Sequence, residues 1–162
     1  MVPWEVPGIE ELAGHYPVIV GYEMRERYRH VLDTRPDAFQ PATRKRLEAA
    51  ASYGPDDHSR SLRRVEELRA RIATSFDAAG IDVLAVATTP FPAPLLGRSE
   101  VNGEPVSAAL LRLCVPFSVL GVPVVSVPDT EGALPVGVQL VGAAVDEAAL
   151  LELAVDVAAA RR

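Results

Sequence analysis

Two serines are the first side chains to consider as nucleophiles, because both lie in apolar segments of the second half of the chain. Ser118 lies in the segment VPFSVL and Ser126 in the segment VVSVP. A catalytic serine needs a general base within hydrogen-bond reach, and the nucleophile elbow of many hydrolases has the pattern G-x-S-x-G. Neither serine lies in such an elbow, and no histidine is near either in the sequence. We therefore expect both to be buried or capping residues, and the chain to hold no catalytic residue of its own.

The three histidines, His15, His30 and His58, are too scattered to predict a metal site. Zinc sites combine histidine with cysteine or acidic residues at short, regular spacings, and no such pattern surrounds these three. Asp56 and Asp57 stand directly before His58 and suggest a metal or acid/base cluster. A helix N-terminus explains the two acids more economically, because aspartate is a preferred capping residue. The sequence predicts no metal ion and no cofactor.

Thr88, Thr89 and Phe91 are the candidate substrate-binding residues. They follow an apolar run at the point where a strand is expected to end in a loop. Open α/β sheets place ligand contacts at such positions, and the alternative role for the two threonines is hydrogen bonding within the turn.

Gln139 and Cys114 are polar or reactive residues inside apolar segments. A buried amide must find hydrogen-bond partners, so we expect Gln139 to bond a loop to a strand, with shaping of a ligand site as the alternative. Cys114 is the single cysteine. It cannot form an internal disulfide, and its apolar neighbours indicate an inert core thiol.

Five helices are expected to position these residues. The third is the clearest, because its apolar residues form one continuous stripe. That stripe consists of Leu62, Val65, Leu68, Ile72 and Phe76. The first helix begins at Val20 and ends before Pro36, and the second covers 41–53. The third runs from an Asp56 or Asp57 cap to Gly80, and the fourth covers 106–115 with Leu110, Leu111 and Leu113 buried. The fifth runs from an Asp146 cap toward Arg161 and Arg162.

Three apolar, β-branched runs at 81–88, 121–127 and 136–141 predict strands, with a proline-rich loop after the first. Strands that are apolar on both faces belong in a sheet covered by helices on each side, so the fold class is α/β. A sheet of three such strands would leave hydrophobic edges without hydrogen-bond partners. We therefore expect something outside this sequence to complete the sheet.

The composition excludes several classes of function. The chain has 162 residues and a net charge of −6, so it lacks the clustered positive charge that nucleic-acid binding requires. It has no apolar run long enough for a membrane span and no basic N-terminus typical of a signal peptide, which predicts a cytoplasmic protein. Residues 1–18 contain several Pro and Gly and no sustained period. We interpret 1–18 as an arm or connection rather than a core element, and 19–162 as a partial domain.

Three segments near the C-terminal end resemble one family when taken in order. They are VPFSVLGVPVVSVP at 115–128, LPVGVQLVG at 134–142 after the acidic turn 129–132, and the closing helix from Asp146. Upstream, DVLAVATTP at 82–90 is similar to the strand and Thr-Pro loop that precede them in that family. This order of motifs resembles the C-terminal third of amidase signature enzymes.

The resemblance implies a mixed sheet flanked by helices and the hydrolysis of carboxylic amides through an acyl-enzyme. The family's nucleophilic serine is activated by a second serine, held in a cis peptide, and by a lysine. A Gly/Ser-rich loop carries the two serines. The only lysine here is Lys45, and no Gly/Ser-rich loop is present.

The sequence also departs from the family pattern at several positions. Ser118 replaces a usual asparagine, Ala133 replaces a glycine, and Ala87 replaces the first proline of the Thr-Pro loop. Members that amidate tRNA carry an aspartate in the helix before 115, whereas 110–114 contains no acid. This difference disfavours an amino-acid amide, whose ammonium group would need an anion.

Three hypotheses follow from the residues and the resemblance. The first is that the chain is the C-terminal part of an amidase, inactive alone, which completes a catalytic half on another chain or belongs to a truncated enzyme. The second is a non-catalytic module that binds small amides or has a regulatory role. The third is a degenerate gene remnant. The expected partners are an N-terminal amidase half or a second copy of the chain, together with a small-molecule amide.

Overall fold

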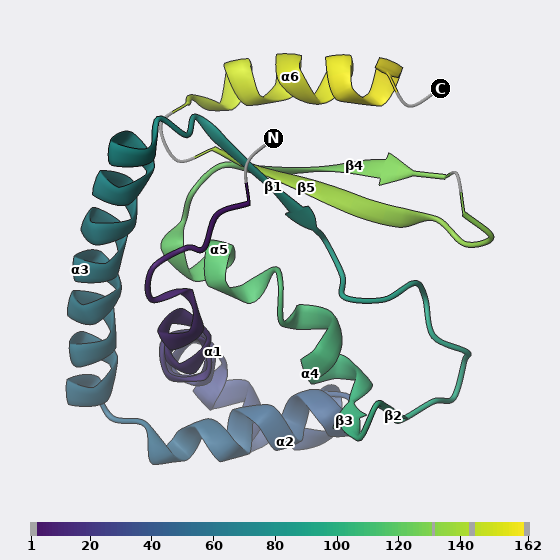
Figure 1. Cartoon of the computed structure of the whole chain (residues 1–162). Helices are drawn as coiled ribbons and strands as arrows, with labels where there is room; N and C mark the ends of the chain where they lie inside the picture. Colours follow the sequence, from purple (N-terminus) through teal and green to yellow (C-terminus); the bar gives the residue numbers. More distant parts are fainter. Residues whose placement is uncertain (1–2, 131, 143–144, 161–162) are drawn as a thin grey trace.

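The computed structural model describes residues 3–130, 132–142 and 145–160, so the interpretations of Glu131, Arg161 and Arg162 lie outside the described residues. Figure 1 shows a small sheet with one helix on one face and a group of helices on the other. In chain order the elements are α1 Ile9–Thr34, η1 Pro36–Ala38, α2 Pro41–Ala49, η2 Ala50–Ser52, α3 Pro55–Ala79, β1 Val83–Ala87, β2 Glu100–Val101, β3 Glu104–Pro105, α4 Val106–Leu111, α5 Val115–Leu120, β4 Val124–Asp129, β5 Val136–Gly142 and α6 Glu147–Ala160.

Helix α1 begins eleven residues before the expected start at Val20. It runs through Gly14 and through Pro17, which lacks the N–H of a regular helical turn. Leu12 is fully buried in the main core, and Ile19 packs against the same core. The interpretation of 1–18 as lacking a core element is therefore wrong. Burial of one face of this helix outweighs the local cost of the two helix-breaking residues.

Helix α3 confirms most of the expected apolar stripe. Val65, Leu68, Ile72 and Phe76 are buried, but Leu62 is exposed and Ser61 takes its place in the interior. The helix begins just before its two acids, with Pro55 at the first helical position after the Gly54 cap. Asp57 accepts a hydrogen bond from the Gly54 N–H at 2.9 Å, and Gly80 ends the helix in the left-handed region with φ of 63°. The expected cap at Asp56 or Asp57 is therefore wrong, because Gly54 is the cap; both acids lie in the first turn, and Asp57 bonds the cap from the third helical position.

The main sheet has the strand order β1-β5-β4, and both ladders are antiparallel. In the register, Val86 and Ser126 both lie opposite Gln139, and Leu84 and Val124 both lie opposite Val141. The combination of this sheet with helices confirms the α/β class. The parallel pairing that a mixed sheet requires does not occur among the strands in the described part of the chain.

Strand β1 is less buried than its apolar sequence predicts. Ala85 and Ala87 are exposed, so the expectation of burial on both faces is wrong for this strand. It lies at one edge of the sheet, and α6 packs over β4 and β5. One face of β1 is therefore left without a covering helix.

Residues 100–120 differ from the single helix expected over 106–115. A two-stranded hairpin, β2 and β3, turns at Asn102 and Gly103, which both have positive φ as a type I′ turn requires. Two short helices follow, α4 and α5. Ala109 is the buried residue of α4, whereas Leu111, which the sequence placed in the interior, is exposed. Leu110 and Leu113, placed there as well, are half-buried.

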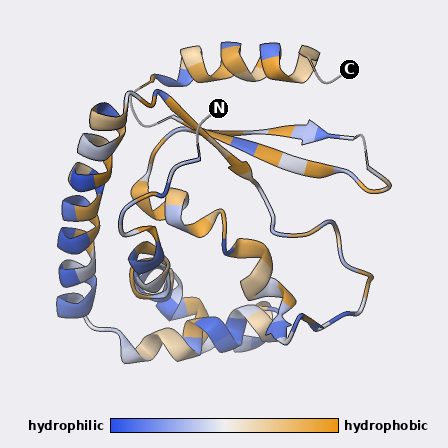
Figure 2. Ribbon diagram, viewed as in Figure 1, coloured by the Kyte–Doolittle hydropathy of each residue, from blue (hydrophilic) through white to orange (hydrophobic). Residues whose placement is uncertain are grey.

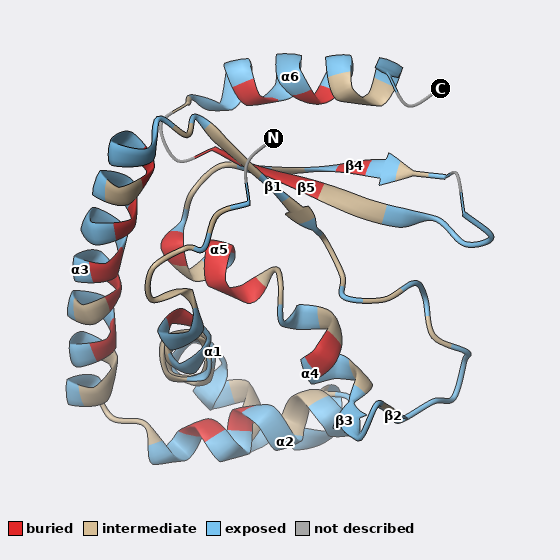
Figure 3. Cartoon of the chain, viewed as in Figure 1, coloured by how far each residue is buried: buried red, intermediate tan, exposed pale blue. Residues whose placement is uncertain are grey.

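The core consists of two clusters on opposite faces of the sheet, as Figure 3 shows in red. The larger cluster joins Leu12, the α3 stripe and Phe117 to Val141 of β5. The smaller one packs Leu150 and Ala154 of α6 against the other face. Asp146 caps α6 as expected, accepting a bond from the Ala149 N–H at 2.8 Å.

No helix within 3–130, 132–142 or 145–160 is long and apolar enough to cross a membrane.

Candidate functional site

Thr88 and Ser126 form a hydroxyl pair across the central strand. Their Oγ1 and Oγ atoms are 2.7 Å apart, although the residues come from β4 and from the first position after β1. The Thr88 N–H also donates to the carbonyl of Gly137 at 2.7 Å. A Cβ on Gly137 would lie only 2.6 Å from the Thr88 hydroxyl and 2.7 Å from that of Ser126. The pair thus closes over a position where only glycine fits.

The other two candidate substrate-binding residues lie in the loop that follows. The Thr89 hydroxyl donates to the carbonyl of Phe91 at 2.9 Å, which is the turn bonding that the sequence offered as the alternative role. Both residues are half-buried. The structure thus brings Thr88, Thr89 and Phe91 together at one end of the sheet, and their contact with a substrate stays a prediction.

Gln139 fixes the same end of the sheet from within. Its side chain is 2% exposed, and its Nε2 donates to the carbonyl of Leu113 at 2.8 Å and to that of Ala87 at 3.3 Å. These bonds join β5 to the end of β1 and to the link between α4 and α5. The expected structural bond between a loop and a strand is confirmed.

Cys114 and Ser118 contact the backbone around this link. The thiol of Cys114 donates to the Thr88 carbonyl at 3.1 Å and is half-buried, so its interpretation as a core residue is wrong. Ser118 is exposed, and its hydroxyl donates to the Cys114 carbonyl at 3.1 Å. Ser126 is exposed too, so neither serine is buried, and neither caps a helix; both hydroxyls nevertheless make hydrogen bonds within the fold. One hydroxyl bonds a carbonyl and the other a hydroxyl, and neither partner is a general base.

The interactions of His58 and His15 involve residues of α1 rather than residues at this end of the sheet. The Nε2 atom of His58 is 2.9 Å from a carboxylate oxygen of Glu23, and its ring packs against Tyr22. His15 lies 3.8 Å from Glu11 at the start of α1. No group of three potential metal ligands occurs in the part of the chain that the structure describes.

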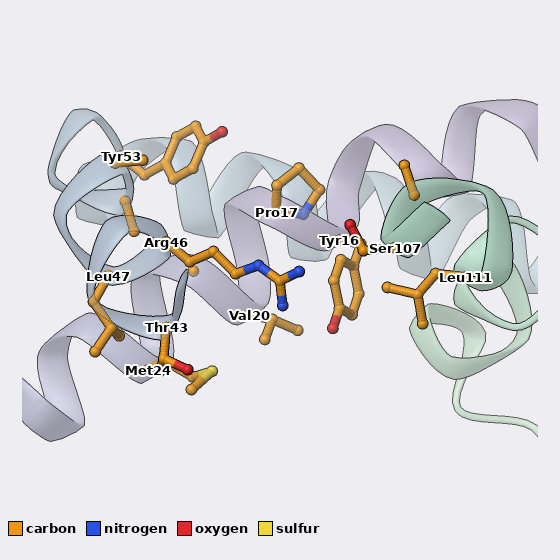
Figure 4. A pocket seen from close by; sticks show the side chains of 14 residues that line it. Tyr16, Pro17, Val20, Met24, Thr43, Arg46, Leu47, Tyr53, Ser107 and Leu111 are labelled. Carbon is orange, nitrogen blue, oxygen red and sulfur yellow. The ribbon is translucent and has the colours of Figure 1, made fainter. Parts of the chain in front are cut away.

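One apolar cavity of about 470 Å³ lies between α1, α2 and α4. Arg46 is the charged residue of its lining, and Figure 4 shows its side chain extending from α2 toward Tyr16 of α1 and Ser107 of α4. Met24 and Leu111 add apolar surface to the walls. A guanidinium above an apolar wall is suited to a small ligand with one anionic or carbonyl end. No sequence pattern indicated this cavity, because its walls come from three separate helices.

A second apolar cavity of about 540 Å³ runs beside β1. It is lined by Leu84, Ala85 and Val86 of β1, by Trp4, Val6, Ile9, Glu10 and Ala13 near the N-terminus, and by Arg112, Leu113, Pro116 and Phe117.

The sequence of residues 2–151 matches a family model described as Amidase. The chain belongs to the amidase family. The matched range includes most of the segment 1–18, in agreement with the extension of α1 into that segment.

Two curated proteins are similar to large parts of this chain. The fatty acid amide hydrolase of Oryza sativa subsp. indica is 33% identical over 162 aligned residues, which cover 92% of this chain and 25% of the rice protein. A glutamyl-tRNA(Gln) amidotransferase subunit from Synechococcus sp. (strain CC9902) is 37% identical over 97 residues, which cover 57% of this chain and 19% of the Synechococcus protein.

A solved structure described as that of an amidase has the same fold. It superimposes with a TM-score of 0.82 at 30% sequence identity, over 91% of this chain and 35% of the solved chain. This amidase-family chain thus spans about a quarter or less of the length of these curated relatives and about a third of the solved structure.

Proposed function

We propose that this chain forms the C-terminal part of an enzyme that hydrolyses carboxylic amides through an acyl-enzyme intermediate. The observation that carries the proposal is family membership across residues 2–151 in a sequence without the family's paired serines and catalytic lysine. The single lysine, Lys45, is exposed on α2. The nucleophile and its bases would therefore come from a polypeptide that carries the other part of the fold, and this chain would be inactive without it.

The role proposed for this chain is to complete the sheet and one wall of the substrate site. Thr88, Thr89 and Phe91 would form that wall, held in place by the Ser126 hydroxyl and the Gln139 amide. Because residues 110–114 contain no acid, the proposed substrate is an amide without an ammonium group. The Synechococcus relative is named as one subunit of its enzyme, which supports an enzyme assembled from more than one chain. A cytoplasmic location belongs to the same proposal.

Complementation tests this function directly. The purified chain is assayed for hydrolysis of simple aliphatic and aromatic amides, alone and after co-expression with a segment that carries the Lys-Ser-Ser half of the 30%-identical amidase. We expect no hydrolysis by the chain alone and hydrolysis by the pair. Ser118→Ala and Ser126→Ala are matched controls in this chain and should not abolish turnover. Hydrolysis by the chain alone that either substitution abolishes would contradict the proposal.

A non-catalytic module that binds small amides or regulates another protein is the second candidate function. The cavity beside Arg46 and a separate buried core favour it, because a module must fold and bind alone. A thermal-shift screen with small amides separates the two candidates. A stable isolated chain whose melting temperature rises with an amide favours the module, and a chain that is soluble only with its partner favours the enzyme part. Lack of soluble chain under both conditions would indicate the degenerate remnant.

A further inference from the structure

The two outer edges of the main sheet present different sets of backbone groups. In an antiparallel ladder, residues alternate between bonding the neighbouring strand and pointing away from it. The Thr88 N–H bonds Gly137 and the Gly142 N–H bonds the Pro123 carbonyl, which fixes the alternation on both sides of β5. The outward-pointing residues are therefore Val83, Ala85 and Ala87 on β1, and Val124, Ser126 and Pro128 on β4.

The edge of β4 is poorly suited to receive another strand. Pro128 is one of its three outward-pointing residues, and proline has no N–H to donate to a new ladder. The Ser126 side chain on this strand is already bonded to Thr88, and α6 packs over the opposite face. The edge of β1 has no proline within the strand, so Val83, Ala85 and Ala87 each direct an N–H outward, and the Ala87 carbonyl accepts a bond from the Gln139 amide.

The edge of β1 also borders the 540 Å³ cavity. Leu84 and Val86 pack toward the larger core cluster, whereas Val83 packs toward the smaller one, so the side chain of Ala85 lies on the face opposite to those of Leu84 and Val86. The cavity is lined by Leu84, Ala85 and Val86 in succession, so it borders β1 along the length of these three residues. Its other walls include Trp4 and Phe117, which pack in the larger cluster, so the cavity lies on that face of the strand.

We propose that the outer edge of β1 binds an extended, apolar β-strand from the polypeptide that carries the rest of the amidase fold. In strand addition, backbone bonds supply affinity and pockets for alternate side chains supply specificity. The three outward N–H groups supply the first, and the apolar cavity beside Leu84 and Val86 supplies the second. The occupant is the remainder of the fold, because this chain covers only 35% of the solved relative. This inference rests on the proposed function and specifies the edge through which the two parts join.

Two proline substitutions provide a matched test. Ala85→Pro removes an outward N–H from β1, and Val124→Pro removes one from β4, while both leave the β5 ladders and the Thr88 to Ser126 pair intact. Binding to the Lys-Ser-Ser segment of the 30%-identical amidase is measured by titration. We expect at least a tenfold weaker Kd for Ala85→Pro and an unchanged Kd for Val124→Pro. A larger loss of affinity for Val124→Pro than for Ala85→Pro would overturn the proposal. Equal effects of the two substitutions, or no binding of the unsubstituted chain, would overturn it as well.

Hydrogen exchange gives a second readout that does not depend on the folding of any variant. Adding the segment should slow exchange of the Val83, Ala85 and Ala87 amides and leave the Val124 and Ser126 amides unchanged. Slow exchange at β1 that arises from raising the concentration of this chain alone would show a second copy at the edge and contradict the assigned occupant. Restored hydrolysis without protection of β1 would refute this inference but not the proposed function. Protection of β1 without hydrolysis would support this inference and refute the proposed function.

Discussion

The two faces of the sheet differ in how completely this chain covers them. On one face, α1, α3 and α5 enclose a continuous core in which Trp4 and Phe76 pack edge to face with ring centroids 4.7 Å apart. On the other face, α6 covers β4 and β5 and leaves the exposed residues of β1 uncovered. Figure 2 shows apolar colours along much of α6, and Leu151 and Val155 on it are 58% and 68% exposed. We call the first region closed because this chain's own residues bury its core, apart from the cavity beside β1. The second region directs apolar surface outward.

The largest expected effect tests whether stability resides in the closed region. Phe76→Ala removes a buried ring from the centre of that core and should lower the free energy of unfolding by about 3–5 kcal/mol. Leu151→Ala is the matched control on α6, and we expect a change within about 0.5 kcal/mol because its side chain is largely exposed. Urea unfolding of the purified variants measures both. Comparable losses for the two substitutions would remove the distinction between the faces.

The next prediction concerns Gly137 of β5, which lies opposite Thr88 at the end of the sheet where the loop after β1 begins. Gly137→Ala places a Cβ 2.6 Å from the Thr88 hydroxyl, so we expect destabilisation at the upper end of about 1–3 kcal/mol. Adding Thr88→Ala and Ser126→Ala removes the two nearest oxygen atoms and should recover part of that loss. Urea unfolding of a mutant cycle measures the recovery, with Gly137→Ala as one change and the Thr88→Ala and Ser126→Ala pair as the other. If the added substitutions recover nothing, the hydroxyl pair does not cause the requirement for glycine.

Gln139 gives a smaller effect on the closed face. Gln139→Met keeps a side chain of similar length but leaves the Leu113 and Ala87 carbonyls without the amide donor. Loss of these buried bonds should cost about 1–2 kcal/mol of unfolding free energy. The exchange rate of the Thr88 backbone amide, which bonds the Gly137 carbonyl, should also rise, because the end of β1 loses its anchor. Unchanged exchange there would show that the amide does not position the loop.

The smallest effect comes from a surface ion pair between α1 and α3. The Arg64 guanidinium hydrogen-bonds Glu11 at 2.5 Å and 2.9 Å and holds the pKa of that carboxyl below its ordinary value of 4.5. A carboxyl whose pKa is lower in the folded state stabilises that state at pH values above the pKa of the unfolded chain. This stabilisation is lost as the pH falls through the pKa of the folded state. Glu11→Gln should therefore lower the melting temperature slightly at pH 7, with the difference shrinking below pH 4.5.

The neighbouring Glu10 provides the control for this ion pair. It shares the first turn of α1 with Glu11, so Glu10→Gln changes the interaction with the helix N-terminus alone. We expect its effect to be smaller than that of Glu11→Gln at pH 7. A difference between wild type and Glu11→Gln that grows below pH 4.5 would contradict the assignment.

Local patterns were sufficient where the nearest residues decide the structure. The α3 stripe, the Asp146 cap and the αL residue at Gly80 all depend on spacings of a few positions. The start of α1 was missed, because Gly14 and Pro17 disfavour a helix locally, and packing against α3 and α5 compensates for them. The spacing of Ile9, Leu12 and Ile19 was the signal that could have indicated it.

For the candidate site, the residue types were predictable and the contacts were not. An amide in an apolar strand predicted that Gln139 must bond inside the protein, but not that its partners are the Leu113 and Ala87 carbonyls. The bond between Thr88 and Ser126 spans 38 positions and depends on the register of three strands. Such a contact has no local signature.

Residue types and short spacings alone were enough to establish the α/β class, the amidase motifs and the absence of a Lys-Ser-Ser set from these 162 residues. The three-dimensional fold was needed to show that β1 and β4 are the two edges and that the edges are unequal. That inequality arises from the antiparallel register, which turns the backbone of Ala85 outward beside an apolar cavity and the backbone of Pro128 outward without a donor. Strand order and register are set by long-range pairing, so no local pattern encodes them.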